Sequence, residues 1–187
     1  MAVRRRRTAD ESRSLILTTA AERLRIYGLE GLNITGVAED AGISHATLIH
    51  HFGSSGGMRD ALAQKMTLDL VQDLVVALDA KVSPSELARN VFAALSEGGH
   101  GKLLAWRAVE GGSGQDFSVV REMFGKLLAT TQKVLEVDTR EDLQRIILLV
   151  ATAAIGYGIA GDTLCDLLGM SEETVDGFPQ WVTAQIG

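Results

Sequence analysis

Cysteine and proline are both scarce in this sequence. Its one thiol, Cys165, cannot form an intrachain disulfide, so nothing points to an oxidising compartment and we expect a cytoplasmic protein. With two prolines, 46% hydrophobic residues and 22% charged residues, the composition excludes a proline-rich disordered chain and is typical of a soluble globular protein. A length of 187 residues can supply one large or two small folded units.

An export signal and a membrane-length apolar run are also missing. The start MAVRRRR is followed by TADESRS, which is neither an apolar core nor a small-residue cleavage site. The most apolar run, IILLVATAAIGYGIAG at 146–161, is shorter than the about 20 residues that a spanning helix needs. It predicts a buried helix and no membrane partner.

Recognisable catalytic motifs are missing too. The sequence contains no G-x-S-x-G elbow, P-loop, dinucleotide fingerprint or H-E-x-x-H, and Cys165 has no clear histidine partner. We therefore expect no enzymatic activity and no cofactor.

Apolar residues instead recur at helical spacing, and no period-two run predicts a strand, so the expected fold class is all-α. A capping box of Thr8 with Glu11, a glycine stop at Gly28, a cap at Asn33 and apolar stripes place the helices. The expected helices span 8–27, 34–41, a short segment after Ser44, 58–80, 84–96, 102–110, 116–136, 140–168 and 171–185.

The net charge of −6 hides an asymmetry along the chain. Residues 1–60 carry eight arginines against seven acids, whereas residues 61–187 carry ten basic residues against seventeen acids. Four consecutive arginines, Arg4, Arg5, Arg6 and Arg7, precede the first helix. Such an arm could reach DNA phosphates or a minor groove, or it could be a solvated tail.

Two small features predict an abrupt turn between the second and third helices. Gly42 can adopt the left-handed conformation that ends a helix, and Ser44 can cap the next one. Leu48 and Phe52 then share one face and would pack inward. Such a reversal is the requirement of a helix-turn-helix, whose second helix presents its outer face to the major groove. The residues left for that outer face are His45, Thr47, His50 and His51.

A metal site is a weaker interpretation of these histidines. His50 and His51 are adjacent, hence about 100° apart around a helix, and no Cys, Asp or Glu lies within a turn to complete a ligand set. A further alternative is that the histidines are solvated and have no role.

The run LEGLNITGVAEDAGISHATLIHHFGSSGGMRDAL, residues 29–62, resembles the TetR-type transcriptional regulators. The resemblance implies a DNA-binding domain over residues 1–57, made of the basic arm and the helix-turn-helix. It implies a helical effector-binding and dimerisation domain over residues 58–187. The implied function is a ligand-responsive regulator, a repressor more often than an activator, that binds a palindromic operator as a homodimer and is released by a small effector.

The resemblance also implies positions that contact DNA, and here the chain departs from the family in two places. Implied contacts to bases and phosphates fall on Asn33, Ser44, His45, Thr47, His50 and His51. Ile49 stands where relatives usually have tyrosine, and Ser55 where they have lysine, so two backbone contacts are missing. The arginine arm could compensate. The alternative is an interaction or ligand-binding module whose helix-turn-helix no longer reads DNA.

An effector pocket would draw on inner-facing residues of the second domain, which could equally be ordinary core. The candidates are Phe92, Leu103, Trp106, Arg107, Met123, Phe124, Leu127, Ile147, Val150 and Tyr157. The few polar groups nearby are Arg107, Glu110, His100 and Thr131. So sparse a polar set predicts a mostly apolar or aromatic effector.

The family resemblance places the dimer interface on the last two long helices. Small residues crowd the helix expected at 140–168, which lets another helix approach closely. Phe178 and Trp181 are candidate interface anchors, or alternatively core residues of the monomer.

Overall fold

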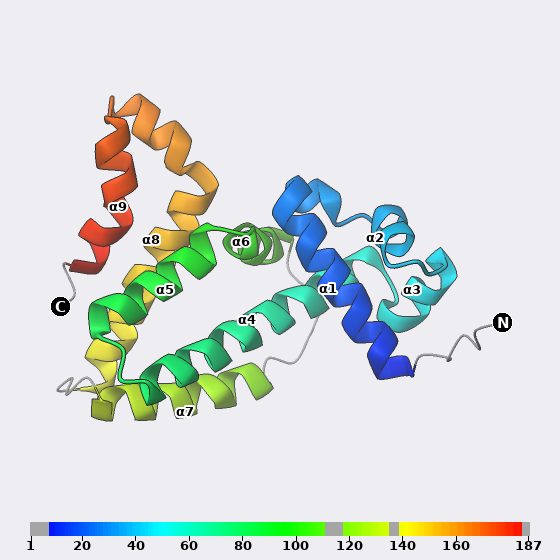
Figure 1. Ribbon diagram of the computed structural model, residues 1–187, viewed down its shortest axis with the longest axis horizontal. Helices are drawn as coiled ribbons and strands as arrows, with labels where there is room; N and C mark the ends of the chain where they lie inside the picture. The colour runs from blue at the N-terminus through cyan, green and yellow to red at the C-terminus, as the bar shows by residue number, and fades with distance from the viewer. Residues whose placement is uncertain (1–7, 111–117, 135–138, 185–187) are drawn as a thin grey trace.

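The computed structural model describes residues 8–110, 118–134 and 139–184, which form helices and no strand (Figure 1). The expected all-α class is therefore confirmed. The short 3₁₀ turn η1 covers Gly28–Gly31. The α-helices are α1 Ala9–Tyr27, α2 Ile34–Asp40, α3 His45–Phe52, α4 Ser55–Asp79, α5 Pro84–Ser96, α6 His100–Glu110, α7 Ser118–Val134, α8 Arg140–Leu167 and α9 Glu172–Ala184.

Helices α1, α2 and α3 form a compact unit at one end of the molecule (Figure 1). Thr8 and Glu11 form the predicted capping box of α1, and Gly28 ends that helix at φ 64°. Gly42 has φ 63°, so the predicted left-handed turn between α2 and α3 is present. The unit buries a core shared with the start of α4, made of Ile16, Leu17, Ala20, Leu24, Leu32, Val37, Ala38, Leu48, Met58, Ala61, Leu62, Ala63 and Leu103.

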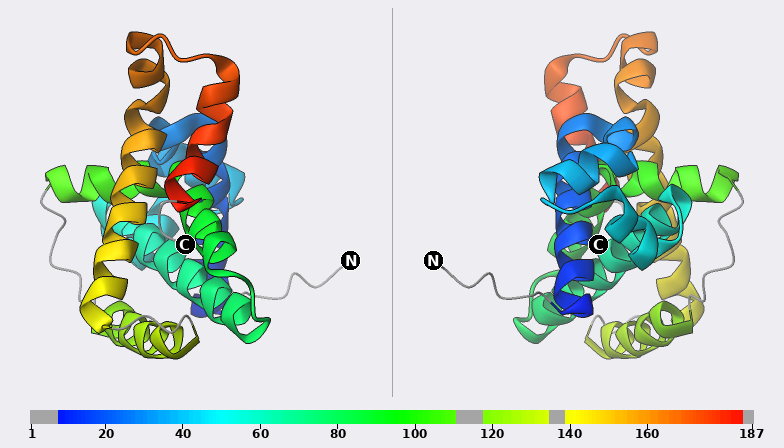
Figure 2. Two further views of the ribbon diagram at one scale, coloured as in Figure 1. Left: turned by 90° about the vertical axis from the view of Figure 1, so that its left-hand side faces the viewer. Right: turned by 90° about the vertical axis from the view of Figure 1, so that its right-hand side faces the viewer.

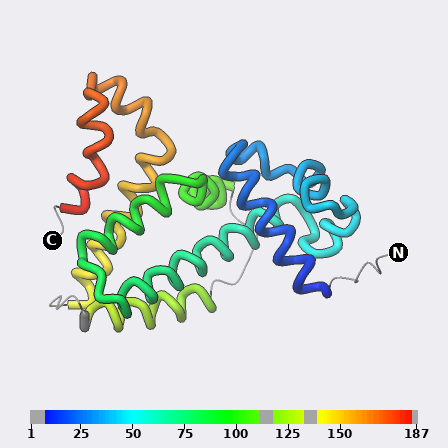
Figure 3. The backbone as a smooth tube through the Cα atoms, in the orientation of Figure 1, coloured from blue at the N-terminus to red at the C-terminus, as the bar shows by residue number. Residues whose placement is uncertain are grey.

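Helix α4 runs from this unit into the rest of the molecule (Figures 1 and 3). It begins at Ser55 rather than at the expected Met58, because Ser54 caps it by accepting a hydrogen bond from the Gly57 amide. Helix α6 likewise begins at His100, two residues earlier than expected.

The second half of the chain packs α5 against α8, with α7 alongside α4 and α9 returning beside the end of α8 (Figures 1 and 2). The close approach of α5 and α8 requires a small residue at their contact. A Cβ on Gly158 of α8 would lie 2.6 Å from the carbonyl oxygen of Ser96 at the end of α5. Gly158 thus has a packing reason that offsets its poor helix propensity, whereas a Cβ on Gly156 would meet nothing within 4 Å.

By length and composition, α8 is the one helix of the described residues that could cross a membrane. In the structure it contacts α5, α6, α7 and α9. Its buried side includes Leu143, Val150 and Ala154, which belong to the core of the molecule. Leu148 and Ile159 are at least half exposed, so the helix expected to be buried at 146–161 is buried on one side only.

Candidate functional site

Helix α3 presents a polar outer face. His45 and His50 are exposed and Thr47 is half-buried, whereas Leu48 is fully buried. His51 is half-buried, and its ring meets the His50 ring edge-on with centroids 5.8 Å apart. The residues that the sequence assigned to one surface therefore do lie on one short, accessible helix.

Side-chain caps fix the start of α2 and of α3. The Ser44 hydroxyl accepts a hydrogen bond from the Thr47 amide at 3.1 Å and lies 2.8 Å from the Thr47 hydroxyl. At α2, the Asn33 side-chain oxygen accepts from the Gly36 amide at 2.8 Å. These caps orient the two helix N-termini, whose partial positive charge favours an anion such as a phosphate.

Two arginines of α1 hold the other helices in place. Arg13 donates to the carbonyl oxygen of His51 at 3.0 Å, and its guanidinium lies 4.4 Å from the Phe52 ring centroid. Arg23 donates to the carbonyl oxygen of Gly31 at 2.8 Å and pairs with Asp40 at the end of α2. The orientation of α3 is thus set by α1 from its inner side, which leaves its outer face unencumbered.

The surface formed by α2 and α3 carries little fixed positive charge of its own. The sequence from 26 to 58 contains no lysine or arginine. Ser55, which replaces the usual lysine, instead donates weakly to the carbonyl oxygen of Leu32 at 3.4 Å, and Ile49 is half-buried. The arm Arg4–Arg7 lies outside the described residues.

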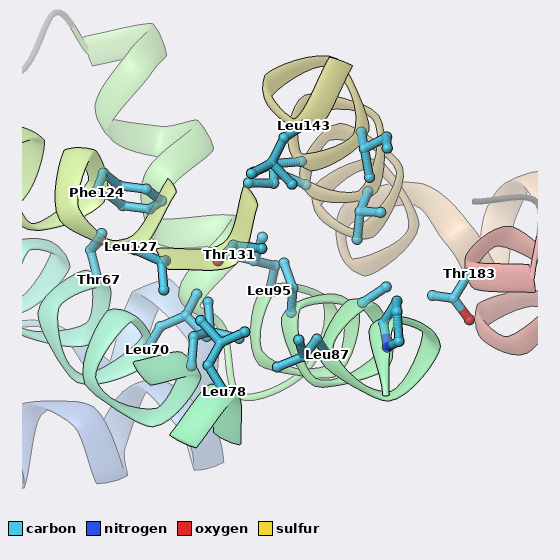
Figure 4. Close-up of a pocket in the computed structure, with 18 of the residues that line it drawn as sticks. Thr67, Leu70, Leu78, Leu87, Leu95, Phe124, Leu127, Thr131, Leu143 and Thr183 are labelled. Atoms are coloured by element: carbon cyan, nitrogen blue, oxygen red, sulfur yellow. The ribbon is translucent and has the colours of Figure 1, made fainter. Parts of the chain in front are cut away.

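A cavity of about 360 Å³ lies in the other half of the molecule, between α4, α5, α7 and α8, and α6 and α9 add residues to its wall (Figure 4). This volume is within the usual range for small-molecule sites. Its lining is Thr67, Leu70, Leu74, Leu78, Pro84, Ser85, Leu87, Ala88, Val91, Leu95, His100, Leu104, Phe124, Leu127, Thr131, Leu143, Ile146, Ile147, Val150, Ala151, Ile155 and Thr183.

Four of the ten sequence-predicted pocket residues line this cavity, namely Phe124, Leu127, Ile147 and Val150. The others lie elsewhere. Phe92 is buried in the core between α5 and α8, where its ring contacts Tyr157, and Leu103 is buried in the core of the N-terminal unit. Trp106 packs beside that same core, Met123 packs against the core of α4 and α7, and Arg107 pairs with Asp60.

The main polar feature of the lining is a hydrogen bond between two helices. Thr67 of α4 and His100 of α6 meet with 3.2 Å between the threonine hydroxyl and Nε2. His100 is 2% exposed, and burial lowers the pKa of its imidazole from 6.5 to about 4, although Asp69 opposes this. The imidazole is therefore neutral at neutral pH.

Residues of α4 and α5 are the part of the lining that sequence reasoning missed. Leu70, Leu74 and Leu78 recur every fourth residue along α4, which indicates an inner face. The same spacing is equally typical of a helix packed on solid core, so the pattern alone carries no signal of a void.

Comparison with solved structures finds proteins of similar fold. A TetR-like transcriptional regulator from Rhodococcus sp. RHA1 matches with a TM-score of 0.57 and 20% identity, over 97% of this chain and 96% of that one. A second Rhodococcus sp. RHA1 transcriptional regulator matches with a TM-score of 0.56 and 20% identity, over 94% and 95% of the two chains. This chain has the TetR-like fold. No protein-family model and no curated protein matches it.

In this TetR-like fold, α6 touches both the N-terminal unit and the cavity. Arg59 of α4 donates to the carbonyl oxygen of Leu32 at 3.3 Å and lies over the Trp106 ring at 4.9 Å. At the other end of α6, His100 and Leu104 line the cavity. A shift of α6 would therefore change its contacts with the N-terminal unit as well as the shape of the cavity.

The TetR-like fold also exposes an apolar face on its last two helices. Leu148, Leu149, Ile159 and Leu167 lie within about 100° of one another around α8 and are between 50% and 75% exposed. On α9, Trp181 is 61% exposed and stacks on Phe178, which packs inward against Tyr157. Of the two aromatic candidates, Phe178 thus belongs partly to the core and Trp181 to the surface.

Proposed function

We propose that this protein is a transcriptional regulator that binds duplex DNA through the outer face of α3. The observation that carries the proposal is the accessible group His45, Thr47 and His50 on a capped helix that follows a left-handed turn. The imidazole and hydroxyl groups can bond to base edges, and the caps of Asn33 and Ser44 aim two helix N-termini outward. The TetR-like fold supports the same function.

The proposed regulator acts as a homodimer that pairs α8 and α9 with their symmetry mates. A single helix-turn-helix reads few bases, whereas a dimer places two recognition helices about 34–36 Å apart on a palindrome. Leu148, Leu149, Ile159 and Leu167 expose apolar side chains on one side of α8, which favours their burial against a second copy over solvation.

We propose that the cavity binds the effector and that α6 transmits its presence. An effector wedged against His100 and Leu104 displaces α6, and with it the contacts of Trp106 and Arg107 to the start of α4. Movement of α4 changes the separation of the two α3 helices. Release from DNA requires that the effector bind the arrangement that cannot bind DNA more tightly than the one that can. The difference between these two affinities limits how far the effector can shift the equilibrium between them. In this scheme the protein is a cytoplasmic repressor.

The direct test is to select fragments of the source genome that the purified full chain retains, and then to measure affinity for the recovered sequence. We expect a palindromic site, bound more tightly than a scrambled duplex by about 10³-fold or more. A variant with His45, His50 and His51 changed to alanine should lose this preference. Its matched control changes exposed Arg89, Glu97 and Lys102 of the second domain to alanine and should keep it.

If the full chain binds no genomic sequence more tightly than the scrambled duplex, α3 does not read DNA. The fold would then serve as an interaction or ligand-binding module, consistent with the lack of lysine and arginine between 26 and 58.

A further inference from the structure

The chemistry of the cavity limits what it can hold. None of the described residues that line it is an aspartate, glutamate, lysine or arginine, and most are leucine, isoleucine, valine or alanine. An ionised group placed there would lose its hydration without gaining a counter-charge. The cavity therefore selects against acids and amines.

Two of its threonines have already committed their single hydroxyl hydrogen. Thr67 donates to the carbonyl oxygen of Ala63 at 2.8 Å, one turn earlier in α4. Thr183 donates to the carbonyl oxygen of Pro179 at 3.0 Å, and Figure 4 shows its oxygen turned away from the labelled leucines. Thr183 thus presents mainly its methyl group to the cavity.

The hydrogen bond from Thr67 to Ala63 fixes the tautomer of His100. Since the Thr67 hydrogen points to Ala63, its oxygen can only accept the 3.2 Å hydrogen bond, and His100 must donate through Nε2. A neutral imidazole with its hydrogen on Nε2 carries a lone pair on Nδ1. Among the described residues Nδ1 has no hydrogen-bond partner, so one acceptor is left.

Thr131 of α7 provides a second unused group. It is 8% exposed, and its hydroxyl makes no hydrogen bond to any other residue that the structure describes. In Figure 4 it lies between Leu127 and Leu95. This hydroxyl oxygen is not one of the enclosed side-chain atoms of the described residues, so it is open to the cavity, where it can both donate to and accept from a bound molecule.

We propose that the cavity binds an uncharged, mainly hydrocarbon molecule that carries hydroxyl groups, which pair with Thr131 and with Nδ1 of His100. The inference depends on the proposed function only for calling this molecule the effector. Binding itself can be measured without DNA.

The test is calorimetric titration of the full chain with decanol, decanoate and decylamine, which share one chain and differ in the charge of the head group. We expect decanol to bind at least about tenfold more tightly than either ion, because only its head group needs no counter-charge. Thr131→Val, which keeps the shape and removes the hydroxyl, should weaken decanol binding by roughly two- to tenfold. Thr183→Val should leave it unchanged, because that hydroxyl is already bonded within α9.

The ligand-free protein supplies a control for folding. Thr131→Val should leave the midpoint of unfolding close to that of the parent, because the Thr131 hydroxyl faces the open cavity and makes no hydrogen bond to the described residues. The inference is overturned if decanol fails to bind, if decanoate or decylamine binds more tightly, or if the two valine variants bind decanol equally well. Decanol binding by a chain that retains no DNA would instead overturn the proposed function and leave the cavity's ligand class intact.

Discussion

Asp60 of α4 and Arg107 of α6 form an ion pair that is almost withdrawn from solvent, with 3.2 Å between the carboxylate and the guanidinium. Their side chains are 3% and 13% exposed. The pair joins the helix that leaves the N-terminal unit to the helix that reaches the cavity. Arg107, a pocket candidate by sequence, thus acts at the joint between the two halves.

Removing one partner of this pair should be costly. Arg107→Met leaves the Asp60 carboxylate buried without its counter-charge, so we expect the free energy of unfolding to fall by about 3–5 kcal/mol. Urea denaturation of the variant and the parent measures this. A matched double variant, Asp60→Leu with Arg107→Met, should recover most of the loss, because well-packed apolar residues often replace a buried pair at little cost. An unchanged midpoint for Arg107→Met would show that the pair contributes nothing.

The depressed pKa of His100 makes stability depend on pH. In the unfolded chain a histidine titrates near 6.5, whereas burial lowers the His100 pKa to about 4, so between these values the unfolded state binds the extra proton. The stability that the neutral, buried His100 contributes is present in full above pH 6.5 and is lost as the pH falls through 4. It amounts to about 3 kcal/mol at most.

His100→Gln is the variant that isolates this contribution, since an amide can still donate to Thr67 but does not titrate in this window. Unfolding free energies of the parent and the variant should be measured between pH 4 and pH 7.5. We expect the difference between their pH profiles to grow as the pH falls below 6.5. Parallel profiles would mean that His100 does not titrate differently on unfolding.

Local signals predicted the helix-turn-helix well, because caps and turns depend on residues close in sequence. Thr8, Asn33 and Ser44 each cap the helix expected of them, and Gly42 has the expected positive φ. The start of α4 was missed because Ser54 competes as a cap three residues before the apolar stripe begins at Met58.

The cavity was predicted only in part, for a reason of geometry. Helical spacing shows which residues face inward, but whether an inward residue meets another side chain or a void depends on how far apart the helices lie. Phe92 and Leu103 face inward onto solid core, whereas Leu70 and Leu74 face the cavity, and no pattern in the sequence separates these cases.

The basic arm should supply much of the phosphate affinity that the helix-turn-helix lacks. Deleting residues 1–7 is expected to weaken binding to the selected site and to lower the salt slope by about 0.9 for each phosphate that the arm no longer neutralises. Titrations at several salt concentrations measure both. An identical slope for the parent and the truncated chain would show that the arm is a solvated tail.

His50 should contribute to base choice more than to general affinity. His50→Ala removes a side chain from the exposed face of α3 while leaving buried Leu48 in place. Removing a base-reading side chain is expected to cost about 1–3 kcal/mol at one position of the site and little on unrelated duplexes. Competition binding with single-base variants of the site measures this. Equal losses on all sequences would assign His50 to the phosphate backbone.

The apolar face of α8 should be the place where two copies meet. Leu148 is 63% exposed in the single chain, so Leu148→Arg places its charge in solvent and should leave the monomer folded. In a dimer the same arginine is buried without a partner, which costs several kcal/mol, so the dissociation constant should rise by more than about 100-fold. Sedimentation velocity over a range of concentrations measures this.

Val109→Arg, at an 86% exposed position near the end of α6, is the matched control and should leave the dimer intact. A Leu148→Arg variant that sediments like the parent would place the interface elsewhere and remove the reason for two α3 helices to be held at a fixed separation.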